Sequence, residues 1–121
     1  LRDFIAQTPI PNTFFITGDT HASWAIEIKD DKKKTIAMEL GTTSISSSNW
    51  NEYESDSIVL LKEKQLMKQN PHIVYGNARD HGFLKVSVNN AQLSAEWIYV
   101  KTNKEINDET ILGKEIIFSK N

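Results

Sequence analysis

The chain has 121 residues, with 14 Lys plus Arg against 16 Asp plus Glu, no Cys, and 39% hydrophobic residues. This length supports one modest core and excludes several independent domains. The balanced charge excludes the basic surface of a sequence-independent nucleic-acid binder, so we expect no strong nucleic-acid binding. The absence of Cys excludes a disulfide scaffold, a thiolate zinc site and a Cys nucleophile. No apolar run is long enough to predict a transmembrane segment.

The first 40 residues predict a connecting segment, a strand and a hairpin. Residues Leu1–Pro11 read as a connector, because Pro9 and Pro11 favour extended backbone and remove amide donors. The continuous apolar run over residues 13–17 predicts a central strand buried on both faces. Alternation over residues 23–29 and again over 35–40 predicts a hairpin, with the charged residues 30–34 as a solvated tip.

The rest of the chain predicts one main helix and a second hairpin. Residues 41–56 are expected to form a long loop, and Ser55 or Asp56 caps a helix that ends at Asn70-Pro71. Residues 84–88 and 93–99 alternate around Asn89-Asn90, which is the clearest hairpin in the chain. Residues 102–110 are expected to be loop, and residues 115–119 a last short strand.

The turn Gly18-Asp19-Thr20-His21 is the strongest candidate for a site, because it directly follows the predicted buried strand. We expect Gly18 to allow a sharp turn, from which Asp19 and His21 converge on one cation. An Asp-x-His triplet is weak evidence by itself. A capping Asp beside a surface His explains the same residues.

Two further clusters carry polar side chains suited to phosphate chemistry. Arg79 fits the geometry of a phosphate oxygen, and His81 could bind a metal or orient a leaving group. A surface turn with an Arg79–Asp80 ion pair is the alternative. The hydroxyl-rich residues 42–49, with Thr43 and Ser44, could donate hydrogen bonds to a phosphate or form a solvated turn.

Four segments in order resemble the PhoD-like alkaline phosphatases of the calcineurin-like metallophosphoesterase superfamily. They are residues 12–25 (NTFFITGDTHASWA), 39–47 (ELGTTSISS), 80–83 (DHGF) and 95–97 (AEW). The resemblance implies an α/β fold (α+β in isolation), namely the C-terminal half of a four-layer αββα sandwich with mostly β-hairpins and one main helix. It also implies that residues 1–121 are the C-terminal portion of a larger catalytic domain, whose earlier motifs supply the remaining metal ligands.

The resemblance further implies hydrolysis of phosphate monoesters or diesters at a dinuclear centre of iron and calcium, with zinc or manganese as alternatives. Asp19 and His21 become the expected metal ligands, His81 and Arg79 the expected catalytic residues, and Thr43 and Ser44 the expected phosphate contacts. The expected partners are a phosphate ester substrate and the N-terminal part of the same enzyme, and the expected location is periplasmic or secreted. The chain alone is expected to be inactive.

Two other hypotheses belong to different classes. A binding module would present Trp24, Trp50 and Tyr53 to a ligand, and would leave Asp19 and His21 unrelated in space. A purely structural domain would leave the site elsewhere in the parent protein. The enzyme hypothesis instead requires Asp19 and His21 to point together into a cleft beside Thr43 and His81.

Overall fold

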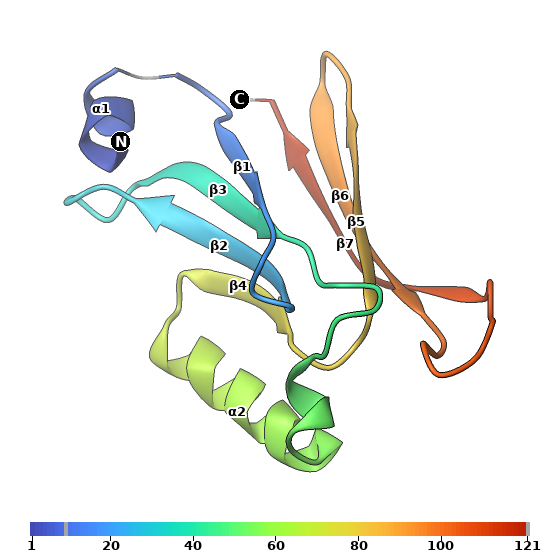
Figure 1. Ribbon diagram of the computed structural model, residues 1–121. Coiled ribbons are helices and arrows are strands. Elements are labelled where there is room, and N and C mark those ends of the chain that lie inside the picture. Colours follow the sequence, from blue (N-terminus) through green and yellow to red (C-terminus); the bar gives the residue numbers. More distant parts are fainter. Residues whose placement is uncertain (9, 121) are drawn as a thin grey trace.

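Two β-sheets packed face to face, with one main helix on the outside, make up the computed structural model, which describes residues 1–8 and 10–120 (Figure 1). In chain order the elements are α1 (Arg2–Gln7), β1 (Phe14–Thr17), β2 (Ser23–Lys29), β3 (Thr35–Gly41), a 3-10 turn (Trp50–Glu52), α2 (Asp56–Gln69), β4 (Ile73–Asn77), β5 (Gly82–Val88), β6 (Gln92–Val100) and β7 (Thr110–Ser119).

The first sheet has the strand order β1-β3-β2-β4. Strand β1 runs parallel to β3, while β2 is antiparallel to both β3 and β4. The predicted hairpin of β2 and β3 is confirmed. Because side chains alternate along a strand, Ala25 and Leu40 face the second sheet, and Trp24 faces the helix side.

The second sheet is the antiparallel meander β5-β6-β7, which confirms the predicted hairpin of residues 84–88 and 93–99. Alternate residues of β6 are buried against the first sheet: Leu93, Ala95, Trp97 and Tyr99. Trp97 is fully buried, and its Nε1 donates to the Gly41 carbonyl of β3 at 2.8 Å. This bond joins the two sheets and satisfies the indole donor inside the core.

Helix α2 packs on the outer face of the first sheet, below it in Figure 1. It runs from Asp56 to Gln69, with Ser55 at the N-cap and Asn70 at the C-cap as the sequence predicts, although the Ser55 side chain makes no capping hydrogen bond. Val59 is fully buried there with Trp24, Ala22 and Ala78. Within the described residues, none of the helices is both long and apolar enough to cross a membrane.

Four details of the sequence prediction are wrong. Residues 2–7, expected to be part of a connector, form α1, while Pro9 lies outside the described residues. Strand β1 is an edge strand, and Ile16 is 62% exposed instead of buried on both faces. Residues 73–77, not predicted as a strand, form β4 at the opposite edge. Strand β7 begins at Thr110, five residues before the predicted start at Glu115.

The expected fold class is confirmed, because the chain is a mixed α/β structure of two sheets and one main helix. Each sheet is built from one continuous stretch of sequence. In the described chain, residues 78–81 make the one connection between the sheets, and the candidate site residues lie beside that connection.

Candidate metal and phosphate site

The turn after β1 adopts strained backbone at two residues that are not glycine. Asp19 has a φ of 75° and His21 a φ of 52°, both in the left-handed region, which residues other than glycine enter uncommonly. Gly18 has no positive φ, so the turn does not use the left-handed conformation that is open to glycine. Strain of this kind costs about 1–3 kcal/mol per residue and is concentrated at functional sites.

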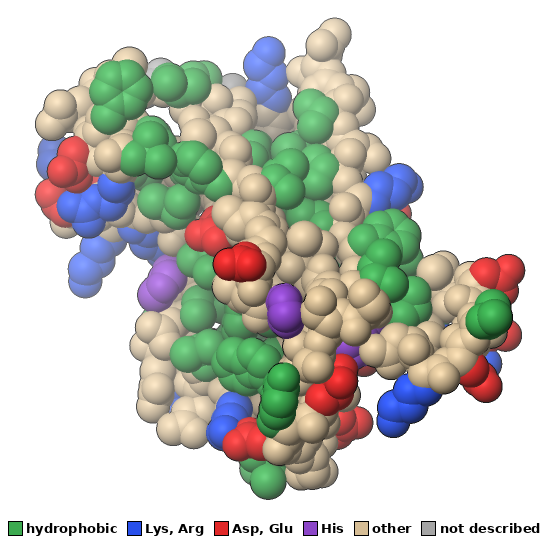
Figure 2. Space-filling model, viewed as in Figure 1, with side chains coloured by type: hydrophobic (Ala, Val, Ile, Leu, Met, Phe, Trp, Pro, Cys, Tyr) green, Lys and Arg blue, Asp and Glu red, His purple; other side chains and the backbone are tan. Residues whose placement is uncertain are grey.

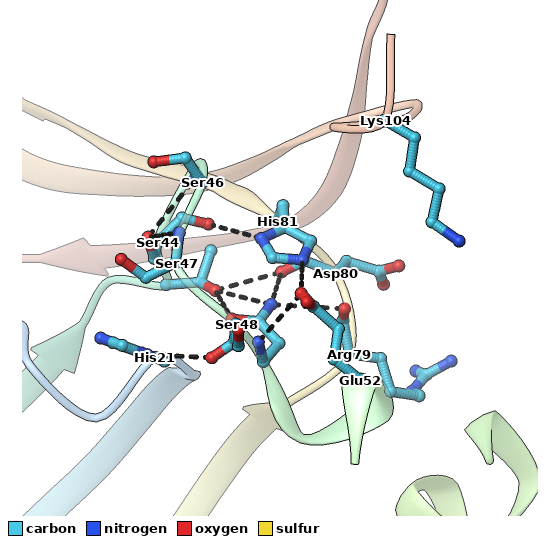
Figure 3. A network of polar contacts seen from close by, with 12 residues as sticks. His21, Ser44, Ser46, Ser47, Ser48, Glu52, Arg79, Asp80, His81 and Lys104 are labelled. Carbon is cyan, nitrogen blue, oxygen red and sulfur yellow. Dashed lines mark hydrogen bonds and ion pairs between the residues drawn. The ribbon is translucent and has the colours of Figure 1, made fainter. Parts of the chain in front are cut away.

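The ring of His21 is oriented by a backbone carbonyl. Its Nδ1 lies 2.9 Å from the carbonyl oxygen of Ser48 (Figure 3). Because a carbonyl only accepts, Nδ1 must carry the proton, and Nε2 of the neutral ring keeps its lone pair. Histidines that bind metals are usually held through the other ring nitrogen in this way.

Asp19 and Thr20 complete the turn. The Asp19 side chain is exposed, and among residues 1–8 and 10–120 it has no hydrogen-bond partner. Thr20 Oγ1 accepts a bond from Trp24 Nε1 at 3.2 Å, which ties the turn to the helix side of the sheet. Asp19 and His21 therefore offer one carboxylate and one imidazole nitrogen, donors that suit iron, zinc or manganese.

His81 lies on the other side of the Ser44–Ser48 segment from His21 (Figure 3). The side chain is 9% exposed; Nδ1 lies 3.2 Å from the Ser44 carbonyl and Nε2 lies 3.0 Å from Glu52 Oε1. Both neighbours accept hydrogen bonds, so both contacts form only when both nitrogens carry protons. Each ring nitrogen of His81 therefore faces an acceptor within the described residues, and its expected catalytic role stays a prediction.

Glu52 is held in its charged form by its neighbours. The hydrogen bond from the Asn49 backbone N–H, together with the bond and charge of His81, keeps the pKa of the Glu52 carboxyl below its usual value, against a smaller effect of burial. Glu52 and Asn49 form a capping box around the 3-10 turn. The spacing Asn-x-x-Glu is a sequence signal that could have identified this pair.

Arg79 pairs with Glu63 of α2, and not with Asp80 as the alternative interpretation expected. Its Nε lies 3.2 Å from Glu63 Oε1, and the same oxygen accepts from the Ala78 N–H at 2.7 Å. Burial works against the charge of Arg79, but Glu63 outweighs it and raises the pKa of the guanidinium. In Figure 3 the guanidinium points away from His21. Arg79 thus anchors the connection between the sheets to the helix.

Thr43 and Ser44 use their hydroxyls within the loop. Thr43 is 6% exposed, and its Oγ1 donates to the Asp80 carbonyl at 3.1 Å. Ser44 Oγ accepts from the N–H of Ser47 at 2.8 Å and from that of Ser46 at 3.3 Å. The Thr43 hydroxyl thus donates within the loop, whereas the Ser44 oxygen accepts two bonds there, and the expected phosphate contacts of both residues stay a prediction.

Asn49 makes the most side-chain contacts of the loop, although its sequence context gave no reason to select it. It is fully buried, and its Nδ2 lies 3.2 Å from Thr43 Oγ1, 3.3 Å from the Arg79 carbonyl and 3.0 Å from the Asp80 carbonyl. These contacts join the Thr43–Asn49 loop to the connection between the sheets.

The structure therefore brings the expected site residues to one end of the molecule but divides their tasks. His21 contacts the loop at Ser48, whereas Thr43, Ser44 and His81 hold that loop in place. A groove of about 410 Å³ elsewhere, lined by residues that include Phe14, Met38 and Phe118, includes none of these side chains. The binding-module hypothesis loses Trp24, which is 9% exposed and packs edge-on against Trp50.

The donor set fits part of a metal site. Over residues 1–8 and 10–120, no group of three or more His, Cys, Asp and Glu side chains is placed to hold a metal ion. Catalytic cations usually take three or more protein ligands. The chemistry of the Asp19 carboxylate, and of a His21 ring whose Nδ1 contacts the Ser48 carbonyl, fits two such ligands. A metal held there would need further ligands from other residues.

Comparison with known proteins decides the family. The sequence profile of the family described as PhoD-like phosphatase matches residues 1–97. The chain belongs to this family. The match covers the Asp19–His21 turn, the loop with Thr43 and Ser44, and the segment of Arg79 and His81.

Two relatives agree with this assignment. Alkaline phosphatase D of Bacillus subtilis (strain 168) is 31% identical over an alignment of 100 residues, and the match covers 78% of this chain and 16% of that protein. A solved structure described as "Structure of PhoD" is 23% identical and superimposes with a TM-score of 0.78, over 99% of this chain and 23% of that one. The chain thus has the fold of one part of a PhoD structure and spans a small fraction of either relative.

Proposed function

We propose that residues 1–121 are the C-terminal portion of a phosphoric ester hydrolase and supply its last metal-binding motif. Family membership supports phosphate ester chemistry. The single observation that carries the role of this chain is the His21 ring, whose Nδ1 lies 2.9 Å from the Ser48 carbonyl while Nε2 has no hydrogen-bond partner among residues 1–8 and 10–120. Asp19, exposed on the same turn, is the second ligand.

In this proposal each side chain of the site has a physical task. Asp19 would hold a metal through its carboxylate, and His21 through Nε2. A dinuclear centre, which we propose to be iron and calcium with zinc or manganese as alternatives, supplies positive charge to the attacking and leaving oxygens of an in-line displacement at phosphorus. Thr43, Ser44 and His81 keep the Ser48 carbonyl in place, and Arg79 fixes the connection that carries His81.

Surface charge agrees with a site whose cations are metals. On the face shown in Figure 2, acidic side chains and histidine lie near the middle, and Lys and Arg lie towards the periphery. In the proposed site, the charge of a bound phosphate dianion would be balanced by the bound metals. We place the parent protein in the periplasm or outside the cell on the family resemblance alone; fractionation of the producing cell checks that location.

The test is hydrolysis of a phosphate monoester and a diester by the full-length parent, with calcium and iron supplied. His21→Ala is expected to lower kcat/KM at least about 100-fold, because loss of a residue that only orients a ligand already costs about 10–100-fold. The matched control is His72→Ala, an exposed histidine after α2, which is expected to leave kcat/KM within twofold of wild type. The isolated chain is expected to show no turnover.

Wild-type activity in the His21→Ala parent would refute the proposal and favour a purely structural role. A titration that finds two micromolar metal sites on the isolated chain would refute the division of ligands between this chain and the rest of the parent.

A further inference from the structure

The orientation of His21 depends on a loop that is fastened at both ends by one carboxylate. Ser48, whose carbonyl contacts His21, lies in the segment between Ser44 and Asn49. That segment is not part of a helix or a strand, so its shape depends on contacts with other parts of the chain: side-chain contacts, and a backbone bond from the Gly82 N–H to the Ser44 carbonyl at 3.1 Å. The contacts at its two ends therefore decide where the Ser48 carbonyl points.

At the Asn49 end of the segment, Glu52 contacts the backbone directly. Glu52 Oε1 accepts from the Asn49 backbone N–H at 3.3 Å, which fixes the residue next to Ser48. Asn49 is itself fully buried, so this end of the segment cannot shift without disturbing buried contacts.

At the Ser44 end of the segment, Glu52 acts through His81. The same Oε1 lies 3.0 Å from His81 Nε2, and His81 Nδ1 lies 3.2 Å from the Ser44 carbonyl. The imidazole thus bridges Glu52 and the start of the segment. In Figure 3 Glu52, His81 and Ser44 follow one another around the loop, with Ser48 between them and His21.

We propose that Glu52 is a positioning residue for His21. It holds both ends of the Ser44–Asn49 segment, the Asn49 end directly and the Ser44 end through His81, and so aims the Ser48 carbonyl at His21 Nδ1. This keeps the proton on Nδ1 and the lone pair on Nε2. The value of that arrangement for metal binding rests on the proposed function, but the arrangement itself does not need a metal.

The experiment compares Glu52→Ala, Glu52→Gln and Glu54→Ala in the full-length parent. Glu54 is a matched control, because it is a glutamate two residues away that pairs with Lys62 of α2. The first readout is the His21 tautomer in the metal-free protein, from nitrogen NMR of histidine-labelled samples, with His21→Gln to assign the signals. The second is the affinity for Mn²⁺ by chelator competition, at a temperature where circular dichroism shows every variant folded.

In wild type and Glu54→Ala, His21 is expected to be the Nδ1–H tautomer. In Glu52→Ala the two tautomers are expected to mix, and the affinity for Mn²⁺ is expected to fall about tenfold, the lower end of the effect of outer-shell partners. Glu52→Gln keeps an acceptor oxygen, so it is expected to restore part of the Nδ1–H tautomer of His21 and part of the affinity for Mn²⁺. If Glu52→Ala does not fold, Glu52→Gln decides, with a smaller change in the same direction.

A wild-type His21 tautomer in both Glu52 variants would overturn the inference. If those variants also melt at a lower temperature, the role of Glu52 is purely structural. Failure of the proposed function looks different: His21→Ala would then bind Mn²⁺ as wild type does. The tautomer measurement still decides the role of Glu52 in that case, because it is made without metal.

Discussion

Replacing the fully buried Asn49 with alanine is expected to destabilise the chain by about 2–3 kcal/mol. Asn49 Nδ2 is the side-chain donor to the Arg79 carbonyl at 3.3 Å, and it shares the Asp80 carbonyl with Thr43 Oγ1. In Asn49→Ala the Asp80 carbonyl keeps Thr43, whereas the Arg79 carbonyl loses its side-chain donor. An unsatisfied buried acceptor costs about 1–3 kcal/mol, and the space left by the amide adds to that cost.

Asn51 provides the control, because it is also an asparagine, lies two positions away, and has an unbonded side-chain oxygen where the Asn49 side chain is bonded. Its Oδ1 is buried and has no partner within the described residues. Asn51→Ala removes an acceptor that is already unsatisfied, so we expect a change within about 0.5 kcal/mol of wild type, or a slight gain.

The assay is urea denaturation of the 121-residue chain and its variants, followed by far-ultraviolet circular dichroism. With a slope of about 2 kcal/mol per M, Asn49→Ala should lower the midpoint by about 1 M at an unchanged slope, and Asn51→Ala should not. Equal midpoints for the two variants would refute the reasoning, because it assigns the cost to the satisfied bonds of Asn49 and not to loss of an amide in this loop.

Two further predictions concern packing and pH. Gly113→Ala is expected to lower the free energy of unfolding by about 2 kcal/mol, because the added Cβ would lie 2.1 Å from the Tyr99 ring. In the control Gly18→Ala the added Cβ meets only a methyl group of Thr42 at 3.8 Å, so the same urea assay should show no change. The pKa of Glu52 is lowered in the folded chain, so its carboxylate stabilises the fold above the unfolded pKa near 4.5, and this stability is lost as the pH falls through the lower, folded value. Glu52→Gln should therefore flatten the fall of stability below about pH 4.5, and an acid limb identical to wild type would contradict this.

Alternation of side chains was enough to predict both hairpins, because each strand pair has one face on the core. In β6 the buried residues Leu93, Ala95, Trp97 and Tyr99 alternate as expected. Strand β4 was missed because its five residues include Gly76, which breaks the apolar pattern. The structure explains that glycine: an added Cβ would lie 2.7 Å from the Trp24 ring, so a larger residue there would displace the indole.

The residues of the candidate site were partly predictable, but their tasks were not. Local sequence placed Asp19 and His21 on one turn and grouped the hydroxyls of residues 42–49. The contacts that assign tasks are long-range: His81 meets Glu52 across 29 positions, and Arg79 meets Glu63 across 16. Spacing in a single sequence carries no information about such pairs, so the sequence could not predict the contacts of Arg79 and His81, and their expected catalytic role stays a prediction.

In the part of the chain that the structure describes, the connection at residues 78–81 is the joint between two consecutive units. The strands up to Asn77 build one sheet, and the strands from Gly82 build the other. The backbone of this joint is bonded by the side chains of Asn49, Glu63 and Asn77, and these bonds fix its conformation. Insertions at the hairpin tips near residues 30–34 or 89–91 would lengthen a loop and disturb at most local contacts such as Arg2–Asp31 and the Lys120 N–H bond to the Ala91 carbonyl. One added residue at the joint would turn the sheets relative to each other and displace His81 from the loop that supports His21.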